Sequence, residues 1–173
     1  IAGDLFDSSA PDSALVSQVN RKIESASGIR FVYAAGNHDP LNINSPYALG
    51  NLPENLYVLG TKDSVFTFDD IKARVYGRSF KEVYDNGEAE FSLTPPDDEY
   101  INIMCIHGEL TSGISSNYNP ITREFIKNSG MDYIALGHIH RRTDIGKLGR
   151  TAFAYCGCIE GQGFDETGEK GFY

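Results

Sequence analysis

All four histidines of this 173-residue chain come at or just after the end of a short apolar segment. These segments are Phe31–Gly36, Ile101–Ile106 and Tyr133–Gly137. A single histidine in such a place is more often structural than a metal ligand. That all four histidines lie in such places favours metal binding over a structural role, because imidazole is a favoured ligand of divalent metals in proteins. The pattern predicts a metal-dependent site built around the histidines His38, His107, His138 and His140.

Two oxygen ligands are expected beside the imidazoles. Asp4 ends a first apolar segment, Ile1–Gly3, and Asn37 ends the segment Phe31–Gly36. Imidazole mixed with carboxylate and amide oxygen suits divalent ions such as Mn, Fe or Zn. Two such ions, held about 3.5–4 Å apart by a bridging carboxylate, clamp a phosphate and stabilise its in-line displacement. We therefore predict two divalent metals, Mn with Fe or Zn as alternatives, whose ligands are Asp4, Asn37, His107, His138 and His140.

Two pairs of residues beside these ligands are candidates for catalysis and substrate binding. His38 directly follows Asn37, and an imidazole that titrates near neutrality is suited to protonate a leaving alkoxide. Asp39 either orients this imidazole or caps the turn before Pro40, and the sequence leaves both roles open. Arg141 and Arg142, next to His140, either contact substrate phosphates or stay solvated.

The elements that must position these residues indicate an α/β fold. Apolar segments without alternation are typical of strands buried on both faces, and ligands gather beyond the carboxyl ends of such strands. We expect the four strand ends to meet at one rim of one sheet. One helix is predicted from Asp12/Ser13 to Gly28. A second is predicted with Asn119-Pro120 as its cap and first turn and Gly130 as its stop.

The remaining segments add antiparallel strands. Short alternating segments at Ser64–Phe68 and Ala73–Tyr76 predict such strands, and Arg142–Cys158 is again strand-like. The Pro- and Gly-containing acidic stretch Asp85–Asp98 predicts a loop. A mixed sheet covered by helices accommodates all of these elements.

Composition limits the class of protein. No apolar run reaches the roughly 18 residues of a membrane helix. The three cysteines form no disulfide framework and favour a reducing, cytoplasmic compartment. Cys156 and Cys158 are either half of a zinc site or small buried apolar residues. Cys105 is expected to be a small buried apolar residue. The net charge of −9 argues against a free-standing DNA-binding domain, but less against DNA as a substrate, because bound cations reverse the local potential.

Four motifs resemble those of the calcineurin-like metallophosphoesterase superfamily. In chain order they are Gly3-Asp4-Leu5-Phe6-Asp7, Gly36-Asn37-His38-Asp39, His107-Gly108 and Gly137-His138-Ile139-His140. The resemblance implies a mixed β-sheet sandwich flanked by helices in four layers (αββα). It also implies that Asp4 bridges two metals, that Asn37, His107 and His138 bind one of them, that His140 binds the other, and that His38 contacts the phosphate.

The family's first motif, Asp-x-His on an earlier strand, does not occur in the chain. The resemblance therefore implies one partial metallophosphoesterase domain over residues 1–173, truncated at both ends, which would bind one metal well and the second poorly.

The segments Ser45–Ala48 and Tyr155–Gly161, with His107-Gly108-Glu109, are most similar to SbcD-type DNA repair exonucleases. This implies DNA as substrate and an ABC-type coiled-coil ATPase as partner. No membrane association is expected, because no apolar run is long enough. Asp7 departs from archaeal and eukaryotic relatives, which often have a histidine there. The alternatives are a phosphoesterase acting on a small molecule or phosphoprotein, and a non-enzymatic scaffold, against which the intact His38 argues. The tyrosines at 47, 57, 84 and 118 either stack on bases or pack within the protein.

Overall fold

A six-stranded mixed sheet is the largest element of the computed structural model, which describes residues 1–48, 50, 52–87, 91–96, 99–112, 116–161, 163–164 and 166–173. Its order is β3-β4-β5-β8-β10-β9. The four central strands are parallel, and the two edge strands are antiparallel to their neighbours. The strands are β3 (Ser64–Phe68), β4 (Ala73–Arg78), β5 (Ile101–His107), β8 (Tyr133–Gly137), β9 (Gly146–Leu148) and β10 (Thr151–Tyr155). A 3-10 turn, η1 (Asp69–Ile71), links β3 to β4. The predicted antiparallel pair of β3 and β4 is confirmed.

A second, small sheet pairs β1 (Phe31–Tyr33) with β2 (Leu56–Val58) in parallel. The predicted strand at Ile1–Gly3 is reduced to one parallel bridge, between Ala2 and Ala34. The chain leaves this pairing at once because Gly3 adopts a left-handed conformation with φ +86°. The expectation that all four apolar segments share one sheet is therefore wrong, since two of them belong to the small sheet.

Helix α1 (Ser13–Ser25) begins where the sequence predicts. The Asp12 carboxylate caps it by accepting hydrogen bonds from the backbone N–H groups of Ala14 and Leu15. Its apolar face carries Val16, Val19 and Ile23 and packs on the small sheet. The helix ends three residues before Gly28, so only its end differs from the prediction.

Helix α2 (Arg123–Asn128) is shorter than predicted and has a different cap. The Thr122 hydroxyl accepts from the N–H of Phe125, and Asn119-Pro120 lies outside the helix. Residues Ile121–Thr122 form a short strand, β7, parallel to β6 (Leu110–Thr111). The apolar residue Ile121 thus fills the core from a strand, which sequence spacing alone did not distinguish from a helical turn.

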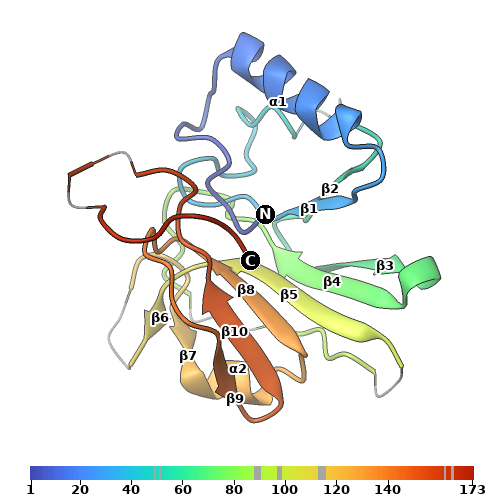
Figure 1. The fold of residues 1–173 in the computed structure, drawn as a ribbon, viewed down its shortest axis with the longest axis vertical. Coiled ribbons are helices and arrows are strands. Elements are labelled where there is room, and N and C mark those ends of the chain that lie inside the picture. The colour runs from blue at the N-terminus through green and yellow to red at the C-terminus, as the bar shows by residue number, and fades with distance from the viewer. Residues whose placement is uncertain are drawn as a thin grey trace.

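Successive side chains along each strand point to opposite faces of its sheet, so both faces carry apolar residues. Three apolar clusters result, each between two neighbouring layers, and the fold therefore has four layers. In β1, Phe31 and Tyr33 face α1, whereas Val32 faces the large sheet. In β5, Cys105 faces the small sheet, whereas Met104 and its like-facing neighbours pack toward α2. The order of layers is α1, the small sheet, the large sheet and α2 (Figure 1). This confirms the predicted αββα architecture.

The predicted loop at Asp85–Asp98 shows no strand or helix in its described part, 85–87 and 91–96; residues 88–90 and 97–98 lie outside the described residues. None of the helices in the described part of the chain is long and apolar enough to span a bilayer.

Candidate metal centre

Four of the five predicted metal ligands meet between the two sheets. Asp4 and Asn37 follow the strand segments of the small sheet, while His107 is the last residue of β5 and His138 follows β8. In the large sheet, His107 pairs with Gly137, which brings His138 beside it. The convergence is as predicted, but it takes place across two sheets instead of along one rim.

The polar atoms of these residues lie close together. The Asn37 Oδ1 is 2.9 Å from His107 Nε2 and 3.1 Å from His138 Nδ1. The Asp4 Oδ2 is 3.3 Å from His107 Nε2. One ligand atom each from Asp4, His107 and His138 falls within 4.8 Å of the others, a spacing that admits one ion.

The tautomer of His107 provides a test of whether a cation fits. Its Nδ1 lies 2.8 Å from the carbonyl oxygen of Ala2, which can only accept, so Nδ1 carries the proton. In the neutral ring, Nε2 then presents a lone pair to the Asn37 and Asp4 oxygens, which are also acceptors. Three acceptors facing one another are unfavourable unless a cation lies among them. The donor set thus fits a divalent metal.

Burial keeps both imidazoles in the form that binds metal. It lowers the pKa of His107, whose side chain is fully buried, although the Asp4 carboxylate opposes the shift. Burial, followed by the nearby His107, also lowers the pKa of His138. A histidine must lose its proton to coordinate an ion, so these environments favour metal binding near neutral pH.

Close backbone packing brings the ligands together. A Cβ added to Gly36 would lie 2.2 Å from Asp4 Oδ1, and one added to Gly3 would lie 2.1 Å from His107 Nδ1. Asp4 (φ 52°) and His138 (φ 99°) themselves adopt left-handed conformations, which are unusual for residues with a side chain. Strained backbone of this kind is often found at functional sites.

His38 lies at the exposed side of this centre, and its partner is Asp7. The His38 Nδ1 is 2.6 Å from Asp7 Oδ1, and its backbone N–H donates to Asp4 Oδ1 over 3.0 Å. The alternative that Asp39 orients this imidazole is therefore corrected, because Asp7 holds that place.

Asp39 instead organises the backbone beneath the centre. Its buried carboxylate accepts hydrogen bonds from the N–H groups of Asp4, Phe6 and Gly36, at 3.1, 2.9 and 2.8 Å. The Tyr33 hydroxyl is also bonded to it, and burial together with this carboxylate raises the Tyr33 pKa. Asp39 thus joins the loop that carries Asp4 to the loop that carries Asn37.

Asn119 supports His107 from behind and was missed in the sequence. Its Nδ2 donates to the His107 carbonyl over 2.8 Å, and its Oδ1 accepts from Arg78 over 3.0 Å. The residue is buried and has φ 45°. Asparagine tolerates this conformation better than most residues do, but nothing in the local sequence links it to a histidine twelve positions away.

His140 does not join the other four ligands. Its Nδ1 is hydrogen-bonded to Glu166, and it groups with Glu166 and Cys158. Arg142 is paired with Glu169 at 2.6 Å, while Arg141 is exposed beside it. Both Cys158 and Cys156 are half-buried, whereas Cys105 is buried as predicted.

The four candidate tyrosines separate into two groups. Tyr47 packs in the cluster beneath α1, and Tyr57 packs against Phe66 and Phe68. The Tyr118 ring lies 4.6 Å from the His138 ring, and Tyr84, mostly exposed, lies 5.8 Å from Tyr118. Of these four tyrosines, Tyr118 packs on a predicted ligand, and Tyr84 packs on Tyr118.

These features define a class of protein. Residues 1–142 match the family described as calcineurin-like phosphoesterase. The chain belongs to this family of metal-dependent phosphoesterases, as the motifs indicated.

A particular relative is the "Uncharacterized metallophosphoesterase YhaO" of Bacillus subtilis (strain 168), which is 30% identical over 184 residues. The alignment covers all of this chain and 43% of the relative, so the chain spans less than half the length of that protein.

Proposed function

We propose that the protein is a metal-dependent phosphodiesterase that cleaves DNA as SbcD-type exonucleases do. The observation that carries the proposal is the meeting of Asp4, Asn37, His107 and His138 beside the His38–Asp7 pair. This arrangement supports phosphoester hydrolysis because it sets metal ligands next to an exposed imidazole with its own carboxylate partner.

Each residue has a defined task in this proposal. Asn37, His107 and His138 would hold one divalent ion, and Asp4 would bridge it to a second one that His140 helps to hold. The ions, when bound, neutralise the phosphate and supply the activated water. Asp7 accepts from His38 Nδ1, so His38 Nε2 remains to carry a proton to the leaving oxygen. The buried Asp39 keeps the two ligand loops in place.

DNA is favoured as the substrate by two features. The segments Ser45–Ala48 and Tyr155–Gly161, with His107-Gly108-Glu109, resemble those of SbcD-type exonucleases. The neighbouring rings of Tyr84 and Tyr118 also offer a stacking surface beside His138, and base stacking on an aromatic ring contributes about 1–3 kcal/mol. Mn is the metal we propose, with Fe or Zn as alternatives, and an ABC-type coiled-coil ATPase is the proposed partner in the cytoplasm.

The second candidate is a phosphoesterase that acts on a small molecule or a phosphoprotein. The net charge of −9 favours it, because an acidic surface repels polyanions. The same metal centre would serve both reactions, so the centre itself does not distinguish them.

The test is a Mn²⁺-supplemented assay of the full-length protein on single-stranded DNA and, in parallel, on bis-p-nitrophenyl phosphate. We expect both to be cleaved and expect a His38→Ala variant to lose most activity on DNA. Hydrolysis of the small ester without any DNA cleavage would reject the proposal that the protein is a nuclease. Failure on both substrates with metal bound would reject the phosphodiesterase.

A further inference from the structure

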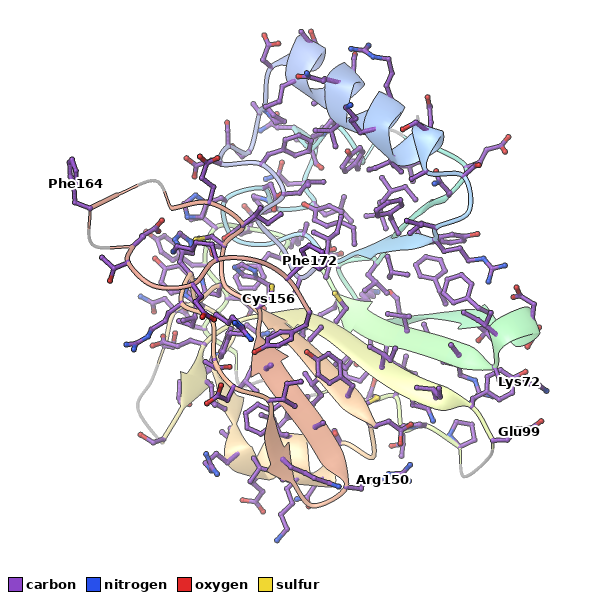
Figure 2. The ribbon with its side chains drawn as sticks, in the orientation of Figure 1. Lys72, Glu99, Arg150, Cys156, Phe164 and Phe172 are labelled. Atoms are coloured by element: carbon purple, nitrogen blue, oxygen red, sulfur yellow. The ribbon has the colours of Figure 1, made fainter. Side chains whose placement is uncertain are left out.

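The segment after β10 returns to the loop that carries His140. Residues 157–173, described except for 162 and 165, loop outward from the end of β10, and Phe164 points away from the rest of the molecule at the tip (Figure 2). The segment then contacts residues 140–143 at several points. Between residues 139–144 and 166–170 lies a cleft of about 670 Å³. We call residues 157–173 the C-terminal strap.

The contact between the strap and His140 is made by Glu166. The Glu166 carboxylate is hydrogen-bonded to His140 Nδ1, and its side chain is only 16% exposed, whereas that of His140 is 53% exposed. A carboxylate accepts, so Nδ1 carries the proton and Nε2 keeps its lone pair. Glu166 therefore selects the tautomer that leaves Nε2 free to bind a cation.

Other contacts fix the backbone on both sides of this pair. The Cys158 N–H donates to the His140 carbonyl over 3.1 Å. At Gly157 (φ 75°) a Cβ would lie 2.8 Å from that same carbonyl oxygen, so the two segments pack with no room for a side chain. Further along, Arg142 is paired with Glu169, and the Tyr173 hydroxyl donates to the Thr143 carbonyl. The strap thus holds the loop independently of Glu166.

We propose that Glu166 is a positioning residue for the second divalent metal, acting through His140. The inference rests on the proposed function, in which His140 is a ligand of that metal. By fixing the ring and its tautomer, and by increasing the basicity of Nε2, the carboxylate raises the affinity of this one site. Loss of such a partner typically weakens metal binding by about 10–100-fold.

Direct metal binding by the group His140, Cys158 and Glu166 is the competing arrangement. One observation argues against it. The Lys170 ammonium lies 3.1 Å from Cys158 Sγ, so a positive charge already lies against the thiol and would repel a cation bound to it. In the proposal, His140 Nε2 and not the Cys158 thiol is therefore the ligand.

The test measures Mn²⁺ binding to the full-length protein by titration calorimetry. In the wild type we expect two ions to bind. In Glu166→Gln and Glu166→Ala variants we expect one ion to bind about 10–100-fold more weakly than in the wild type. The affinity for the other ion should stay within twofold of the wild type, which also shows that the fold is intact. The matched control is Glu169→Gln, which removes a carboxylate of the same strap that contacts Arg142 instead of His140. It should bind both ions as the wild type does.

Several results would overturn the proposal. Unchanged binding in both Glu166 variants would do so, as would a wild type that takes up a single ion. An equal loss in Glu169→Gln would mean that the strap acts as a whole and that Glu166 has no particular role. A loss in Cys158→Ser, with a sulfur-to-metal absorption band when Co²⁺ replaces Mn²⁺, would show that the thiol itself binds. Because these measurements need no substrate, they remain decisive even if no ester is hydrolysed.

Discussion

The His38 imidazole and the Asp7 carboxylate form a hydrogen bond of 2.6 Å between Nδ1 and Oδ1, at the exposed edge of the metal centre. Asp7 stands only three residues after Asp4, so one short loop supplies both a metal ligand and the partner of the proposed acid. The pair is the part of the site whose role in the reaction is most directly testable.

Replacing Asp7 by Asn should slow the reaction only when the leaving group needs a proton. We expect kcat to fall about tenfold or more on DNA, whose leaving alkoxide needs a proton, and to change little on bis-p-nitrophenyl phosphate, whose leaving phenolate does not. Steady-state kinetics on both substrates measure this. In a background of His38→Ala the same substitution should have no further effect, and an equal loss on both substrates would contradict the role.

Replacing Asp39 by Asn should act on stability more than on proton transfer. The carboxylate accepts three backbone hydrogen bonds in a buried place, and an amide cannot replace all of them. We expect the free energy of unfolding to fall by about 3 kcal/mol. Urea denaturation in EDTA checks this. An unchanged unfolding midpoint together with lost activity would instead support the role considered from the sequence, in which Asp39 orients His38.

Replacing Gly36 by Ala should weaken metal binding without removing any ligand. The new Cβ would lie 2.2 Å from Asp4 Oδ1 and would displace that carboxylate. We expect at least about a tenfold loss in Mn²⁺ affinity, measured by calorimetry, as for other disturbances around ligands. Gly28→Ala is the matched control because nothing lies within 4 Å of its Cβ. Equal affinities in the two variants would refute the packing argument.

The metal-free protein should lose stability below about pH 6.5. Burial lowers the pKa of His107 and His138 beneath the ordinary value of 6.5, so the unfolded chain takes up protons that the folded chain does not. The free energy of unfolding is then greatest above pH 6.5 and decreases as the pH falls through the folded-state pKa values.

Urea midpoints in EDTA between pH 7.5 and 5.5 measure this slope, in a range where most carboxylates stay ionised. A His107→Gln variant should show a shallower slope. A wild-type midpoint that does not change over this range would contradict the burial argument.

Much of the fold follows from the sequence because several of its strands are continuous apolar segments with polar ends. The positions of His107 and His138 were predictable, since β5 and β8 are buried neighbours that stop together. The sheet that each segment joins was not predictable, because Ile1–Gly3 and Ile101–Ile106 are both apolar segments. The difference arises from a left-handed backbone at Gly3 and from pairing with distant strands.

The supporting residues were harder to find for a related reason. Asp7 and Asp39 are both carboxylates within the quoted motifs, and only the folded arrangement of their two loops decides which one reaches His38. Asn119 and Glu166 act on histidines 12 and 26 positions away in the sequence, through contacts that depend on loops. Local patterns carry no information about such contacts.

Half of the first metal site belongs to each sheet, since Asp4 and Asn37 follow the small one and His107 and His138 the large one. An ion bound there would therefore cross-link the two layers, in addition to the apolar cluster around Ala34, Leu59 and Cys105 and the packing of Tyr57 on Phe66. Removal of the metal by a chelator should weaken the contact between the two sheets and leave each sheet internally intact. Metal supply would then control the rigidity of the domain as well as its chemistry.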